Sequence, residues 1–128
     1  MKKHKVVATM KDGTVKKGMT SDFAPHRPVF HLELDDGTKE AVEIESLKAL
    51  FFVKTFQGNR QRKTKYKAMP KWEGKKLKVT FIDGESIIGY ALEYDDSKSG
   101  FFLTPSDVKG NNERVYIVAS STKHVVYL

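Results

Sequence analysis

Apolar residues fall at every second position in two stretches of the chain, Val6–Met10 and Leu77–Phe81. This spacing is typical of a half-buried β-strand, because successive side chains of a strand point to opposite faces. An Asp-Gly pair follows each stretch, beginning at Asp12 and at Asp83. Glycine accepts a positive φ without steric cost, so each pair favours a tight turn. The pattern therefore predicts a β-hairpin at the start of each half of the chain.

The two stretches belong to a longer internal repeat. The sequence VVATMKDGTVKKG, which starts at Val6, is echoed by LKVTFIDGESIIG, which starts at Leu77, at an offset of 71 residues. The order of matches along the unit predicts an internal duplication, against the alternative that two β-rich halves share Asp-Gly turns by chance. With two gaps of two residues each, the alignment places Phe30 over Phe101, Leu32 over Leu103, Glu40 over Glu113, Val42 over Val115, Ile44 over Ile117, and Lys48–Val53 over Lys123–Leu128.

Each copy is expected to contain five strands. Gly18 and Gly89 interrupt the second strand of each copy, and a glycine inside a strand usually marks a bulge or a sharp bend that lets a small sheet close. The short polar crossings at Glu45–Leu47 and Val118–Thr122 have room for one 3₁₀ turn each. The second to fifth strands are predicted at Val15–Phe23, Val29–Leu34, Lys39–Ile44 and Ala49–Lys54, and at Glu85–Tyr94, Gly100–Thr104, Glu113–Ile117 and His124–Leu128.

Five short strands with a bent second strand describe a small SH3-like or Sm-like barrel, and the Asp-Gly-x4-Gly start of both copies resembles the first Sm motif. Sm proteins bind RNA through an asparagine after the second strand and a glycine near the fourth. Here Phe30 and Phe101 lie near the first position, and no glycine occurs in Val42–Leu47 or Val115–Thr122, so the RNA site is not carried over. The Phe-x-Pro-x-x-Pro-x-Phe-x-Leu pattern from Phe23 also resembles an uncharacterised bacterial protein family, which implies a fold but no activity.

We therefore expect an all-β fold of two tandem SH3-like or Sm-like five-stranded small barrels related by internal duplication. The first barrel would span residues 1–56, a basic linker or arm residues 57–75, and the second barrel residues 76–128. Separate barrels and copies that exchange strands both stay open. The apolar side chains expected in the cores are Val6, Met10, Phe30, Leu32, Ile44, Leu50 and Phe52, and Leu77, Phe81, Phe101, Leu103, Ile117, Val125 and Tyr127.

Positive charge is concentrated in the connecting segment. The chain carries a net charge of +7, and Lys54–Lys76 contains nine basic residues against the single acid Glu73. Exposed aromatic rings between cations suit single-stranded nucleic acid, because cations offset the phosphates while rings stack on bases for ~1–3 kcal/mol each. The segment therefore predicts a site for RNA or single-stranded DNA, formed by Arg60, Arg62, Lys63, Lys65, Tyr66, Lys67, Lys71 and Trp72.

Two other interpretations of the sequence stay open. Lysine-rich linkers often serve only solubility, and Tyr66 and Trp72 would then cover a barrel end or the seam between the copies. The alternative function is a protein–protein interaction or assembly module that pairs through exposed strand edges with a partner or with another copy. The last predicted strand, His124–Leu128, offers such an edge.

Catalysis is not expected, because the chain has no phosphate loop, no nucleophile elbow and no His-Glu-x-x-His motif. His26 and His31 are five residues apart with Pro28 between them, so they point to opposite faces of a strand and predict no metal site. No cofactor is expected. Cysteine is absent, the first apolar run ends at Lys11, and no run approaches ~20 apolar residues, so we expect a cytoplasmic protein without membrane contact.

Overall fold

The alternating stretches of the sequence form β-strands. The computed structural model describes residues 3–54, 74–92, 94–95, 97–106 and 112–128, and these contain ten strands, two 3₁₀ turns and no α-helix. The all-β prediction is confirmed. The elements are β1 (His4–Met10), β2 (Val15–Thr20), β3 (Val29–Glu33), β4 (Lys39–Glu43), η1 (Ile44–Ser46), β5 (Leu47–Val53), β6 (Lys75–Phe81), β7 (Ser86–Ala91), β8 (Gly100–Pro105), β9 (Asn112–Val118), η2 (Ala119–Ser121) and β10 (Thr122–Tyr127).

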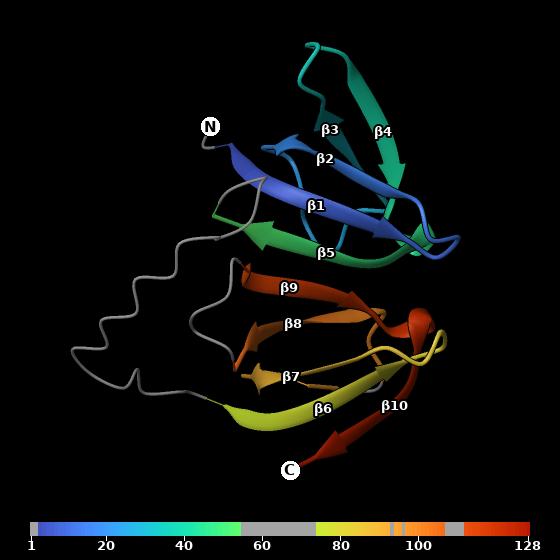
Figure 1. Cartoon of the computed structure of the whole chain (residues 1–128), viewed down its shortest axis with the longest axis vertical. Coiled ribbons are helices and arrows are strands. Elements are labelled where there is room, and N and C mark those ends of the chain that lie inside the picture. Colours follow the sequence, from blue (N-terminus) through green and yellow to red (C-terminus); the bar gives the residue numbers. More distant parts are fainter. Residues whose placement is uncertain (1–2, 55–73, 93, 96, 107–111) are drawn as a thin grey trace, which may run out of the picture.

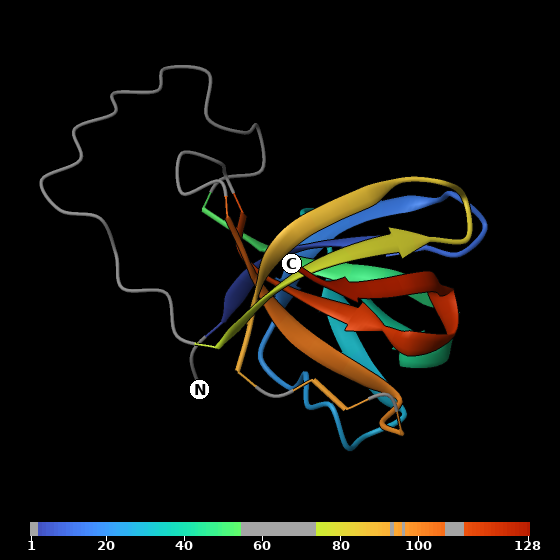
Figure 2. The ribbon, with the colours of Figure 1, turned by 90° about the horizontal axis from the view of Figure 1, so that it is seen from below.

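All ten strands belong to one open antiparallel sheet in the order β10-β6-β7-β8-β9-β5-β1-β2-β3-β4. The first five strands of the chain are therefore ordered β5-β1-β2-β3-β4, and the second five repeat this order as β10-β6-β7-β8-β9. The two halves meet where β5 pairs with β9, side by side in Figure 1. Seen from below, the sheet is strongly curved, and the β1–β2 and β6–β7 hairpins project in the same direction (Figure 2).

Strand pairing corrects the sequence alignment in the fourth strand. Phe30 pairs with Val42, and Phe101, which is 71 residues after Phe30, pairs with Ile117. Val42 therefore corresponds to Ile117, at an offset of 75, and the alignment of Val42 with Val115 is wrong by two residues. Because side chains alternate with a period of two, a shift of two keeps every apolar residue on the same face and leaves the sequence pattern intact.

The pairing of the first and last strands also repeats between the halves. Val6 pairs with Phe52, and Leu77 pairs with Tyr127. Each of these ladders contains one register shift, which leaves Lys48 out in the first half and Lys123 out in the second. Both 3₁₀ turns come directly before these last strands, as predicted.

Gly18 and Gly89 lie where two strands approach closely. A Cβ atom added at Gly18 would be 2.5 Å from the Glu33 carbonyl oxygen, and one at Gly89 would be 2.4 Å from the Thr104 carbonyl oxygen. The ladder between β2 and β3 is short and contains the single pair Met19↔Glu33. The two glycines therefore let the third strand of each half pass close over the bent second strand. Both second strands end earlier than predicted, at Thr20 and Ala91.

The sheet encloses two hydrophobic cores, and the central strands contribute to both. Tyr116 and Val118 of β9 pack in the core of the first half, whereas Ala49 and Phe51 of β5 pack in the core of the second half. This double burial explains the unbroken apolar runs in β5 and β9. Eleven of the predicted core residues are buried, and Met10 and Val125 are partly buried.

The prediction that Tyr127 belongs to a core is wrong. Its side chain is 54% exposed, because β10 is the outermost strand and only β6 covers one of its sides. No helix of the described residues has the length and apolar character needed to cross a membrane.

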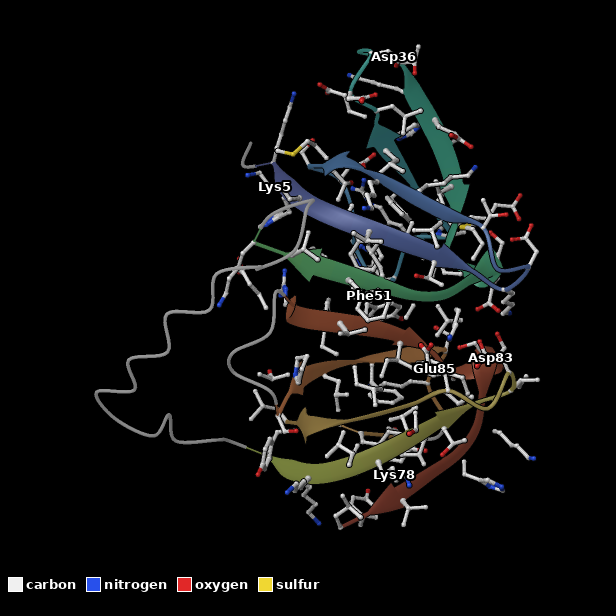
Figure 3. All side chains as sticks on the ribbon, viewed as in Figure 1. Lys5, Asp36, Phe51, Lys78, Asp83 and Glu85 are labelled. Carbon is white, nitrogen blue, oxygen red and sulfur yellow. The ribbon has the colours of Figure 1, made fainter. Side chains whose placement is uncertain are left out.

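A buried lysine joins the two halves at the β5–β9 seam. Lys48 Nζ donates hydrogen bonds to Asp83 Oδ2 at 2.7 Å and to Glu85 Oε1 at 2.9 Å. Both carboxylates belong to the β6–β7 turn, and Figure 3 labels them. Burial disfavours the charged form of Lys48, but the two carboxylates outweigh it and raise its pKa above the ordinary value. The hydrogen bond from Lys48 also lowers the pKa of Asp83.

Candidate nucleic-acid interface

A basic cleft lies at the end of the sheet where β1 and β9 begin and β5 ends. Among the described residues that line it, four carry a full positive charge and Glu113 alone is acidic. Figure 3 shows Lys5 at this end, near the start of β1. We call it the basic cleft; its lining residues are Lys3, His4, Lys5, Met19, Phe52, Val53, Lys54, Glu113 and Arg114.

Antiparallel pairing brings these cations together from distant parts of the chain. The start of β1 meets the end of β5 because Val6 pairs with Phe52. The start of β9 meets the same place because Phe52 also lies opposite Arg114. Lys54 follows β5 directly. The cleft therefore depends on contact between the two halves and would not form from either half alone.

The guanidinium of Arg114 lies over two aromatic rings. Its guanidinium carbon lies 4.4 Å from the centre of the Phe52 ring and 4.8 Å from that of Phe102. His4 contacts the same Phe52 ring edge-on, with ring centres 5.7 Å apart. Stacking uses the face of a guanidinium and leaves its N–H donors in the plane, where a phosphate can accept two of them. Among the described residues, Arg114 has no carboxylate within ion-pair distance.

Lys3 is less available than Arg114. Its Nζ donates to Glu33 at 2.9 Å, and this hydrogen bond holds the pKa of the Glu33 carboxyl below its ordinary value. The side chains of Lys3 and Glu33 are 50% and 31% exposed, and surface ion pairs of this kind stabilise a fold only weakly. A phosphate can therefore compete with Glu33 for Lys3.

All the site residues predicted from the sequence lie outside the described residues. They are Arg60, Arg62, Lys63, Lys65, Tyr66, Lys67, Lys71 and Trp72. The basic segment that contains them begins in the sequence at Lys54, which lines the basic cleft. Sequence reasoning missed Lys3, Lys5 and Arg114 as members of one surface. The Lys-Lys-His-Lys run at the N-terminus was an available signal, whereas Arg114 stands alone in the sequence and only the strand pairing places it there.

The two histidines considered for a metal site, His26 and His31, have different surroundings. His31 Nδ1 lies 2.7 Å from Asp22 Oδ2, and the His31 backbone N–H donates to Asp22 Oδ1 at 2.9 Å, while His26 is exposed. Burial works against the charged form of Asp22, yet the hydrogen bonds from His31 outweigh it and lower the Asp22 pKa. No three metal-binding side chains come together within the described part of the chain.

The fold and the basic cleft define an all-β protein with a positively charged surface between two halves of equal strand order. Residues 2–128 match the model of DUF6982, a family of unknown function, and the chain belongs to this family. Comparison with curated proteins found no match, and comparison with solved structures found none. The family match agrees with the predicted resemblance to an uncharacterised family and carries no activity with it.

Proposed function

We propose that this protein is a non-enzymatic binding module for RNA or single-stranded DNA, built from two SH3-like or Sm-like units related by duplication. Three observations support the duplication. The halves have the same strand order, the first strand of each half pairs with its last strand in the equivalent register, and the register shifts at Lys48 and Lys123 match. The observation that carries the function is the basic cleft, one of whose lining residues, Lys54, is also the first cation of the most basic segment of the sequence.

In this proposal the cleft and the segment hold one backbone of phosphates. Arg114 supplies a preoriented bidentate donor, and Lys5 of β1 and Lys54 after β5 add point charges in the same cleft. Beyond Lys54, the cations between Arg60 and Lys71 extend the track, and Tyr66 and Trp72 stack on bases. Such a site selects single strands through stacking and charge, with little base specificity.

The proposal is tested by measuring binding of labelled single-stranded RNA and DNA over a range of salt concentrations. The logarithm of the affinity should fall linearly with the logarithm of the salt concentration, with a slope of about −0.7 for each phosphate contact. Fluorescence of Trp72, the only tryptophan, gives a second signal from within the proposed site.

Arg114→Glu should raise the dissociation constant about tenfold or more, since a hydrogen bond to a charged group contributes about 1.5–3 kcal/mol. The slope should become shallower by about 0.7. The matched control is Lys78→Glu, which makes the same change in net charge at an exposed position of β6 outside the cleft. Equal losses in both variants, or no binding of either nucleic acid at low salt, would refute the proposal.

A further inference from the structure

Two strands of the sheet have an open side. β4 and β10 are the first and last strands of the sheet order, so each presents a row of backbone N–H and C=O groups without a sheet partner in the described structure. The β10 edge is also apolar. Val126, Tyr127 and Leu128 are 52%, 54% and 62% exposed. Exposed apolar side chains on an open edge indicate a surface that another strand covers.

The seam between the halves shows how such an edge can be covered. There, β5, the last strand of the first half, pairs with β9, the fourth strand of the second half. The two open edges are the complementary elements, because β4 is the fourth strand of the first half and β10 is the last strand of the second. We propose that β10 of one chain pairs antiparallel with β4 of a second copy and so repeats the β5–β9 seam between molecules.

The offset of 75 residues that relates β5 to β10 and β4 to β9 fixes the register of this contact. At the seam Phe52 lies opposite Arg114, with the guanidinium over the ring at 4.4 Å. The corresponding pair between copies is Tyr127 opposite Lys39, again an aromatic ring and a cation. Both side chains are exposed in the single chain, so the pairing requires no rearrangement of a core.

The salt bridge across the seam also has a counterpart. Lys48, at the register shift of β5, reaches Asp83 in the β6–β7 turn. Lys123 holds the same position in β10, and Asp12 holds the same position in the β1–β2 turn. Asp12 and Lys123 are both exposed in the single chain. In the contact between copies Lys123 would therefore meet Asp12 of the next chain.

The contact between copies is weaker than the internal seam. Tyr116 and Val118 of β9, which pack in the first core, correspond to Ala41 and Glu43 of β4. Less apolar surface is buried, so the association should be reversible and dependent on concentration. Because different surfaces meet, the arrangement is head-to-tail and produces rings or open chains rather than a closed dimer. The proposal that copies pair through β4 and β10 does not depend on nucleic-acid binding.

The absence of cysteine allows a direct test by disulfide trapping. Directly opposed residues of an antiparallel pair have Cα atoms about 4.5–5.5 Å apart, within the range that a disulfide spans. Proteins with Lys39→Cys and with Tyr127→Cys should form a cross-linked heterodimer when mixed under mild oxidation. Val15→Cys, at a position 53% exposed on β2, is the control partner and should cross-link far less with Tyr127→Cys.

Each outcome of the trapping decides the question. Preferential cross-linking of Tyr127→Cys with itself would mean that β10 pairs with β10 and would overturn the proposal, as would equal yields with the Val15→Cys control. As a second measurement, Val126→Glu should weaken self-association of the whole chain at least tenfold in sedimentation equilibrium, because it places a carboxylate opposite Glu40 of the next copy. An unchanged association, or a wild-type chain that stays monomeric at millimolar concentration, would also overturn it.

Discussion

Replacing Gly18 by alanine tests the close approach of β2 and β3. The added Cβ would lie 2.5 Å from the Glu33 carbonyl oxygen and 2.9 Å from Leu32 Cγ, both well inside normal contact distances. The φ of Gly18 is not positive, so alanine meets no backbone strain there and the whole cost is steric. Leu32 is fully buried, so β3 cannot move away without disturbing the first core.

Overpacking of this kind costs about 1–3 kcal/mol, and we expect the upper end because one clashing atom belongs to the backbone and cannot change rotamer. For a chain of 128 residues, 3 kcal/mol corresponds to a fall in melting temperature of about 10 °C. Thermal and urea unfolding followed by far-ultraviolet circular dichroism measure the change. The urea midpoint should fall while the m-value stays unchanged.

Gly13→Ala is the matched control for this prediction. Gly13 has a φ of 91°, and a Cβ atom added there would have no other atom within 4 Å. Alanine at this position therefore meets backbone strain of about 1 kcal/mol and no steric clash. Gly18→Ala should be the more destabilising of the two. If it costs no more than Gly13→Ala, the close approach of the strands does not determine stability and the reasoning fails.

Two further predictions concern the core and the seam. Leu50→Ala should lower the free energy of unfolding by about 2–5 kcal/mol in urea titration, because Leu50 is fully buried in the first core; an effect below about 1 kcal/mol would contradict its place there. Asp83 has a lowered pKa, so its contribution to stability is present above its unfolded pKa of about 3.9 and is lost as pH falls through the folded value. Lys48 has a raised pKa, so its contribution to stability is fully present below its unfolded pKa of about 10.4 and is lost as pH rises through the higher folded value. Asp83→Asn should therefore flatten the acid side of the stability profile, and an unchanged acid limb would count against the seam contact.

Local patterns predicted the strands well, because alternation and Asp-Gly turns act over a few residues. Both first hairpins and both 3₁₀ turns occur where the sequence indicated. The alignment of β4 with β9 failed because a shift of two residues preserves the alternation, and only pairing with β3 and β8 determines the register. The prediction that Tyr127 is buried was wrong for a related reason. The sequence pattern around Tyr127 is that of a core residue, but β10 is an edge strand and leaves its side chain exposed.

The sequence predicted only part of the candidate site. A run of cations is visible in any sequence, and the site around Arg60, which lies outside the described residues, was predicted in this way. Arg114 and Lys5 belong to one surface only because β5 lies between β1 and β9. Such a surface follows from non-local pairing, which composition and spacing do not encode.

The sharing of side chains across the β5–β9 seam has a consequence for protein synthesis. A nascent chain that has emerged only as far as Val53 already contains all five strands of its first half, yet it lacks Tyr116 and Val118, which complete that half's core. Phe51 is then without the neighbours that partly bury it. The core of the amino-terminal half therefore stays incomplete during synthesis, with apolar surface in contact with water, until β9 has been translated.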